Sequence, residues 1–190
     1  MDIITLSELN RTVLECLVRL NYLCSLGTDE AIKNSLNIHS SPRARNQKYI
    51  WKEFKKFKDK IDEYRYRLEL FYENKDYNLQ NSITRKSLSD IPKIRKAAET
   101  SIKNVERVLN YNGYSEELQN MFFFEDVNTL VFAINLQIDI VRDYLRDNCS
   151  ELEYNNLVEL YDLHELSEPQ INQGVIRNNI SLKKTFELYG

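Results

Sequence analysis

The sequence predicts an all-α protein: a single all-helical domain over residues 1–190, folded as a helical bundle of about six to eight helices with one long central helix near residues 42–74. Two observations favour this class. Only 4 glycines and 3 prolines interrupt the 190 residues, so turns are few and elements are long, whereas a sheet protein would need many more turn residues. Apolar residues also recur at alternating spacings of four and three along several segments, which is a helical period.

The first expected helix begins near Thr5, which is in capping-box register with Glu8, and ends near Gly27. Its apolar residues, Val18 among them, cover more than one face of the helix. A helix of that kind is expected to be central in the bundle and covered on most sides. A short second helix is expected over residues 28–38.

The long third helix carries the clearest pattern in the chain. Pro42 suits its first turn, and about 30 residues give a rod of roughly 45 Å. The seam that should pack along a neighbouring helix consists of Ile50, Phe54, Phe57, Ile61, Tyr64, Leu68 and Phe71. Residues 74–89 are polar and aperiodic, and we expect them to form the longest loop.

The C-terminal half is expected to be helical over residues 92–112, 115–124, 126–148, 150–168 and 181–188. The helix over 126–148 repeats the same alternation, with Val127, Val131, Ile134, Ile138, Val141 and Leu145. Ser150 and Glu153 form a second capping box. The helix that follows has an expected inner stripe of Leu157, Leu160, Tyr161 and His164, which makes His164 a hydrogen-bonded core residue.

Charge is distributed unevenly although the net charge is only -3. Residues 42–67 contain ten basic and four acidic side chains, whereas residues 115–168 contain two basic and thirteen acidic ones. The two regions could be solvated faces whose opposite fields help helices or subunits to dock. The acidic region could instead mimic nucleic acid or capture a basic partner. A third interpretation is an RNA- or DNA-binding stripe made of Arg43, Arg45, Lys48, Lys52, Lys55, Lys56 and Lys60.

Three charged residues of the first helix, Arg11, Glu15 and Arg19, stand four residues apart and therefore share one face. Because much of that helix is apolar, we expect the three side chains to be partly buried and paired in a ladder that fixes helix register. The alternative is that Arg11 or Arg19 binds a phosphate group.

Other classes of protein find little support in the sequence. No apolar stretch approaches the roughly 20 residues that span a bilayer and no secretion signal begins the chain, so we expect a cytoplasmic protein with no membrane contact. Cys16 and Cys24 lie about 12 Å apart on one helix, too far for a disulfide, and with Cys149 they match no zinc pattern. We expect buried, reduced thiols and no metal. With 4 scattered glycines no phosphate-binding loop can form, so we expect no nucleotide or other cofactor.

Residues 11–23 resemble the first helix of uncharacterised bacterial proteins in the HEPN-like group, where an arginine precedes a glutamate and a tyrosine-leucine pair follows. The matching residues are Arg11, Glu15, Tyr22 and Leu23. This resemblance implies a helical bundle, commonly dimeric, from toxin-antitoxin, abortive-infection or CRISPR-linked systems. Many HEPN proteins cleave RNA without a metal, so the resemblance also implies RNA as a candidate substrate.

The chain departs from the HEPN ribonuclease pattern, in which a histidine follows an arginine by four to six residues. In-line attack by the 2′-OH needs that proton acceptor and that cation. Neither His39 nor His164 follows an arginine at this spacing. The leading hypothesis is therefore a bacterial or phage conflict-system protein, not an enzyme, whose long helix binds a protein partner or a second copy. The alternative is an RNA-binding protein or a ribonuclease with a non-standard site near His39, Arg45 and Asn46.

Overall fold

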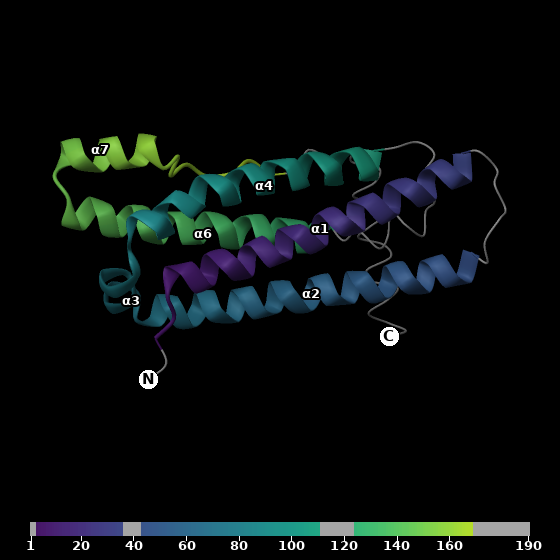
Figure 1. Ribbon diagram of the computed structural model, residues 1–190, viewed down its shortest axis with the longest axis horizontal. Helices are drawn as coiled ribbons and strands as arrows, with labels where there is room; N and C mark the ends of the chain where they lie inside the picture. Colours follow the sequence, from purple (N-terminus) through teal and green to yellow (C-terminus); the bar gives the residue numbers. More distant parts are fainter. Residues whose placement is uncertain (1–2, 36–42, 111–123, 169–190) are drawn as a thin grey trace.

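The computed structural model describes residues 3–35, 43–110 and 124–168, and in these it contains helices and no strand. The helices are α1 (Leu6–Ser35), α2 (Arg43–Glu73), α3 (Lys75–Ser82), α4 (Arg85–Asn110), α6 (Phe124–Asn148) and α7 (Glu151–Leu160) (Figure 1). The prediction of an all-α bundle with a long helix near residues 42–74 is confirmed. The helices expected over 115–124 and 181–188 lie essentially outside the described residues.

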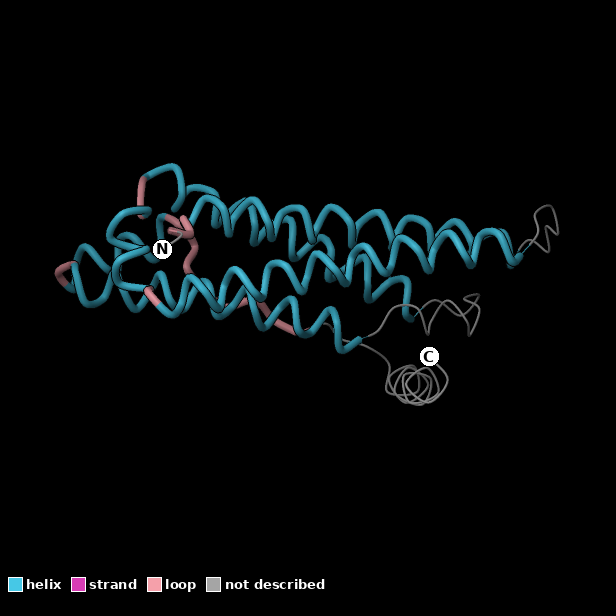
Figure 2. The backbone as a smooth tube through the Cα atoms, turned by 90° about the horizontal axis from the view of Figure 1, so that it is seen from below, coloured by secondary structure: helices cyan, strands magenta, loops and turns pink. Residues whose placement is uncertain are grey.

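Four long helices, α1, α2, α4 and α6, run along the long axis of the molecule (Figures 1 and 2). Helix α1 packs against α2 on one side and α4 on the other, and α6 packs against both α2 and α4. The short helix α3 connects α2 to α4 at one end, so α1 and α4 begin at the same end and run in the same direction (Figure 1). Helix α7 turns back along α6.

The two apolar seams predicted for α2 and α6 form the centre of the core. Every described member of the α2 seam, from Phe54 to Phe71, is buried, and so is every member of the α6 seam from Val127 to Leu145. The side chain of Ile50 lies outside the described part. The confirmed seams follow directly from the helical period, because one apolar stripe per helix must face its neighbours.

Both predicted capping boxes receive structural support. The hydroxyl of Thr5 accepts a hydrogen bond from the backbone N–H of Glu8 at 3.1 Å. Likewise the hydroxyl of Ser150 accepts one from the N–H of Glu153 at 3.2 Å. Each bond satisfies an N–H group that has no partner within its own helix.

The predicted end of the first helix at Gly27 is wrong. Helix α1 continues through Gly27 to Ser35, and no glycine among the described residues has a positive φ. The separate helix expected over 28–38 therefore does not exist in the described residues. A glycine inside a helix is only mildly unfavourable, so the 30-residue helix tolerates it.

The predicted loop over residues 74–89 is also wrong, because α3 and the first turn of α4 occupy it. Three of its polar side chains, Asn78, Ser82 and Ser87, are buried. The Asn78 side-chain amide donates to the carbonyl of Phe71 at 3.1 Å. Thr84 and Ser87 cap α4 reciprocally, with N–H to hydroxyl distances of 2.8 and 3.0 Å. Helix α4 thus begins seven residues before Pro92.

Helix α7 ends at Leu160, earlier than the predicted stop before Pro169. Asp162 then adopts a left-handed backbone conformation with φ of 51°, which short polar side chains tolerate. Leu160 and His164 are exposed, so the predicted inner stripe is wrong at both positions. Leu163 and Leu166 are buried in their place.

Residues 161–168, here called the strap, form a turn followed by a segment without regular secondary structure, and side chains of α4 and α6 bind this strap. The Asn135 amide accepts from the N–H of Leu166 at 2.7 Å and donates to the carbonyl of the same residue at 3.1 Å. Arg95 of α4 is buried, binds the Asp162 carboxylate at 3.1 Å and donates to the His164 carbonyl. Two leucines and these polar contacts fix the strap on the bundle.

A chain of hydrogen bonds crosses the core and touches all four long helices. The Tyr64 hydroxyl of α2 donates to Gln137 of α6 at 2.6 Å. Gln137 donates to the Asn10 side chain of α1 at 2.7 Å, and Asn10 donates to the Ser87 carbonyl of α4 at 3.0 Å. All four residues are buried. Such a chain fixes the rotation of each helix, because a rotated helix would leave a buried polar group without its partner.

Candidate binding groove on α1

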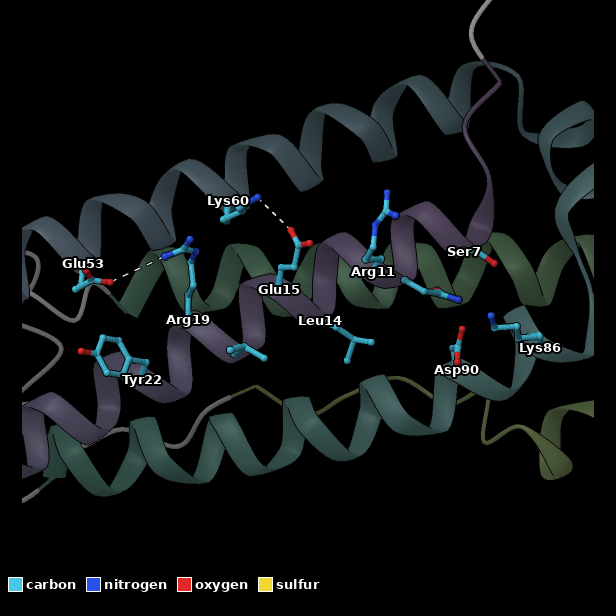
Figure 3. A pocket seen from close by; sticks show the side chains of 12 residues that line it. Ser7, Arg11, Leu14, Glu15, Arg19, Tyr22, Glu53, Lys60, Lys86 and Asp90 are labelled. Carbon is cyan, nitrogen blue, oxygen red and sulfur yellow. Dashed lines mark hydrogen bonds and ion pairs between the residues drawn. The ribbon is translucent and has the colours of Figure 1, made fainter.

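An open groove of about 950 Å³ follows the outer face of α1, with α2 on one side and α4 on the other (Figure 3). The residues that line it come from these three helices. They are Ser7, Asn10, Arg11, Leu14, Glu15, Val18, Arg19, Tyr22, Glu53, Lys60, Lys86 and Asp90. We refer to this feature as the α1 groove.

The floor of the α1 groove is an apolar row, Leu14, Val18 and Tyr22, spaced four residues apart on α1. Val18 is 67% exposed and Tyr22 is 43% exposed, while Leu14 is partly buried. The expectation that α1 is covered on most sides is therefore wrong on this face. The opposite face of α1 supplies the buried core residues, so the helix has two apolar faces of which only one is covered within the described chain.

The wall toward α2 is built from ion pairs. The Lys60 ammonium lies 3.1 Å from Glu15 of α1 and 3.1 Å from Glu63 of its own helix. Its hydrogen bonds to Glu63 and Glu15 raise the pKa of Lys60. Glu53, which is largely buried, lies 3.1 Å from Lys56 and 4.0 Å from Arg19. This wall is thus held together by paired charges.

The predicted ladder along α1 takes a different form in the structure. Arg11, Glu15 and Arg19 do share one face and all line the groove, as the sequence predicted (Figure 3). The ion pairs of Glu15 and Arg19, however, cross to Lys60 and Glu53 of α2. The ion-pair partners of Glu15 and Arg19 thus come from the neighbouring helix α2 and not from the same face of α1.

One end of the groove carries cations without carboxylate partners. Figure 3 shows Arg11 with its side chain directed toward α2, and Lys86 on the α4 side of the groove next to Asp90, with Ser7 between the two walls at this end. Among the described residues neither Arg11 nor Lys86 forms an ion pair, and the nearby Asp90 lies 3.8 Å from Lys93. A ligand with a negative charge would be favoured here.

At the other end, the Tyr22 hydroxyl lies 2.6 Å from the hydroxyl of Tyr49 of α2. This hydrogen bond raises the pKa of Tyr22. The pair closes the gap between α1 and α2 and presents two aromatic rings that are each more than two-fifths exposed.

The remaining basic residues singled out from the sequence lie along α2. Lys52, Lys55 and Lys56 are exposed, and Lys56 pairs with Glu53. Arg43, Arg45, Asn46 and Lys48 belong to the first turns of α2, but their side chains lie outside the described part. His39 lies outside the described residues altogether. Of the predicted binding residues whose side chains the structure describes, Arg11, Glu15, Arg19 and Lys60 line one site.

Reactive side chains are few in the described residues. Burial raises the pKa of the Cys16 and Cys24 thiols to about 12 each. His164 is exposed, with its Nε2 3.7 Å from a Glu159 carboxylate oxygen. No group of three or more His, Cys, Asp or Glu side chains suited to a metal ion occurs in the part of the chain that the structure describes.

Several groove residues were not predicted from the sequence. Val18 and Tyr22 share the face of Arg11, Glu15 and Arg19, so the helical spacing along α1 is the signal that indicates an apolar row beside these charges. Lys86 and Asp90 could not have been found, because they lie on the segment that looked like a loop or just beyond it.

The described helices also bear on membrane association. In the described residues every helix is too short or too polar to cross a bilayer.

The HEPN-like resemblance rests on residues 11–23, which the structure places on α1 with the arginine and glutamate in the groove. Comparison of the chain with protein-family models, curated proteins and solved structures finds no match.

Proposed function

We propose that this protein is a binding scaffold and that the α1 groove receives an α-helix of a partner protein. The observation that carries the proposal is the exposed apolar row at the floor of the groove, with Val18 at 67% exposure. An apolar row between charged walls is the arrangement by which helix-binding grooves hold an amphipathic helix.

The dimensions of the groove favour a helix as the ligand. From Ser7 to Tyr22 the lining of α1 spans about 22 Å, the length of roughly four helical turns. Apolar side chains at every fourth position of α1 match the ridge that a second helix presents at the same spacing. The flanking helices α2 and α4 would hold such a ligand from both sides.

The charges favour a ligand whose one end is acidic. Glu15, Glu53 and Asp90 already have basic partners within the chain, whereas Arg11 and Lys86 have none among the described residues. Carboxylates of the ligand near Arg11 on the α2 side, or near Lys86 on the α4 side, would gain attraction and would fix the direction in which the helix lies.

Photo-crosslinking in the organism that carries the gene tests this function. A photoreactive amino acid in place of Val18 should capture a protein, and the captured peptide should map to a helix with an apolar stripe. The control position is Phe132 of α6, which is 71% exposed but lies outside the groove, and should capture nothing comparable. Equal capture at both positions, or none at Val18, would contradict the proposal.

RNA binding along α2 is the second candidate function. Lys52 and Lys55 are exposed and form no ion pair among the described residues, so they are available for phosphates. Affinity for RNA should then fall steeply with salt and should be weakened by Lys52→Ala with Lys55→Ala. Cleavage of tRNA that His39→Ala and Arg45→Ala abolish would support a ribonuclease.

The biological setting follows from the HEPN-like resemblance alone. We propose a bacterial or phage conflict system, in defence or counter-defence. Neighbouring genes that encode other components of such systems would support this setting, and a neighbourhood of unrelated metabolic genes would argue against it.

A further inference from the structure

The outward face of α7 is acidic and apolar. Tyr154, Leu157 and Val158 pack toward the core, whereas Leu152 is 72% exposed and Leu160 is 69% exposed. Glu153 and Glu159 are exposed as well, and the helix contains no lysine or arginine. Two large leucines facing water on a ten-residue helix are a surface suited to association.

This face complements the α1 groove in length. Leu152 and Leu160 are separated by eight residues, about 12 Å along the helix axis. Leu14 and Tyr22 at the groove floor are also separated by eight residues, again about 12 Å. The whole of α7 is about 15 Å long, so it fits within the roughly 22 Å of the groove.

The two surfaces also complement each other in charge. The glutamates of α7 are Glu151, Glu153 and Glu159, and only Glu159 has a basic neighbour among the described residues, His164. The groove offers Arg11 and Lys86, which form no ion pair in the described part of the chain. Opposite charges on two exposed surfaces attract each other and also exclude ligands of the wrong sign.

Resting on the function proposed above, we infer that the groove's partner is a second copy of this chain, which inserts its α7. Within one chain, α7 packs on α6, and Figure 3 shows α6 behind α1, away from the side on which the groove opens. The contact therefore forms between copies. Two copies, each with the outward face of its α7 docked in the groove of the other, form a closed dimer with two identical contacts.

Charge reversal with complementation tests this exchange. Light scattering should give the wild type at least twice the 22.6 kDa of one chain. The groove variant Arg11→Glu with Lys86→Glu, and the α7 variant Glu153→Lys with Glu159→Lys, should each fall to 22.6 kDa. An equal mixture of the two variants should regain the larger mass, because each groove then meets an α7 of opposite charge.

Two controls keep the test decisive. Lys52→Glu with Lys55→Glu reverses charge on α2 outside the groove and should leave the larger mass unchanged. Leu152→Ser removes an apolar contact without changing charge and should weaken association, whereas Phe132→Ser on α6 should not. Circular dichroism of each variant establishes that the helices are retained.

The outcomes separate this inference from the function on which it rests. A wild type of 22.6 kDa, or a mixture of variants that does not reassemble, overturns the α7 exchange. If such a monomer still captures another protein through position 18, the proposed function stands without the exchange. If the chain self-associates but the groove variant leaves association intact and position 18 captures nothing, both are overturned.

Discussion

At the scale of single residues, the buried hydrogen-bond chain from Tyr64 through Gln137 and Asn10 to Ser87 is the most consequential feature of the core. Each link joins a different pair of helices at 2.6–3.0 Å. Apolar contacts tolerate sliding and rotation, but buried polar groups do not, because a group that loses its partner is left without water to replace it. The chain therefore defines one arrangement of the four helices.

Replacing Gln137 by leucine keeps the side-chain volume but leaves the side-chain oxygen of Asn10 without its donor, and it leaves the Tyr64 hydroxyl with only the Ala133 carbonyl, at 3.4 Å. We expect Gln137→Leu to lower the free energy of unfolding by about 1–3 kcal/mol, the cost of leaving one buried polar group unpaired. Urea denaturation measures this change in the free energy of unfolding. Gln80→Leu is the matched control, since Gln80 is exposed on α3 and its loss should change stability by less than about 0.5 kcal/mol. Equal effects of the two substitutions would show that the chain does not hold the helices.

The thiols give a second prediction at this scale. Because burial raises the pKa of Cys16 and Cys24 to about 12, only about one thiol in 10,000 is ionised at pH 8. A chromogenic thiol reagent at pH 8 should react quickly with Cys149, which is only half-buried, and with the other two cysteines only after denaturation. Cys149→Ser should abolish the rapid phase. Rapid reaction of more than one thiol in the native protein would contradict the described core.

Residue-level features are predictable where they depend on neighbours in the sequence. The N-cap hydrogen bonds of Thr5 and Ser150 and the seams of α2 and α6 depend on local spacing, and the sequence predicted them correctly. The burial of Asn10 and Gln137 depends on partners as far as 127 residues away, which no local pattern reveals. The exposure of His164 was missed for a related reason, since α7 ends before it.

At the scale of elements, α1 and the strap depart most from simple sequence rules. Glycine commonly marks the end of a helix, yet α1 continues through Gly27. The contacts of α1 with both α2 and α4 offset the weak helix propensity of one glycine.

Gly27→Ala distinguishes the two possible roles of this glycine. In a continuous helix the substitution should raise the free energy of unfolding by about 0.5–1 kcal/mol, because alanine has the higher helix propensity. If Gly27 ended the helix in a left-handed conformation, the same substitution would be destabilising instead. Thermal or urea denaturation shows whether Gly27→Ala raises or lowers the free energy of unfolding. The reverse type of substitution in the same helix, Ala31→Gly, should lower it.

One amide side chain, that of Asn135, binds the backbone of Leu166 in the strap. Asn135→Ala removes both hydrogen bonds to the backbone of Leu166, so we expect hydrogen exchange at the Leu166 amide to accelerate about tenfold or more, the equivalent of about 1.4 kcal/mol. Asn156→Ala, an exposed asparagine on α7, serves as the control and should leave that amide unchanged. Unaltered exchange in Asn135→Ala would mean that the buried leucines and the arginine contacts hold the strap without Asn135.

Helix α3 shows why some elements could not be predicted. Residues 75–82 are mostly polar and lack an apolar stripe, so periodicity indicates a loop. Their stability comes from tertiary contacts instead: the Ser82 hydroxyl accepts from the N–H of Leu6 at 3.1 Å and donates to the Asn78 carbonyl at 2.5 Å. Contacts of this kind form only when the start of α1 and the end of α3 come together in the folded chain.

At the scale of the whole molecule, chain topology creates the groove. Because α3 connects α2 to α4 across one end, α1 lies between α2 and α4, and its outer side is left uncovered in the described residues (Figure 1). The sequence predicted that Arg11, Glu15 and Arg19 share a face. It could not predict that Lys60 and Glu53 would flank this face on one side and Lys86 and Asp90 on the other, since that depends on which helices are neighbours.

The most direct test of the account is capture through position 18 with and without the cations of the groove. With the photoreactive group at Val18, Arg11→Glu with Lys86→Glu should reduce capture of the partner protein by about tenfold or more, as loss of about 1.4 kcal/mol of binding free energy requires. Lys52→Glu with Lys55→Glu, on the outer side of α2, should leave capture unchanged. Capture that survives reversal of the groove charges, or that disappears only when the α2 charges are reversed, would contradict the α1 groove as the recognition surface.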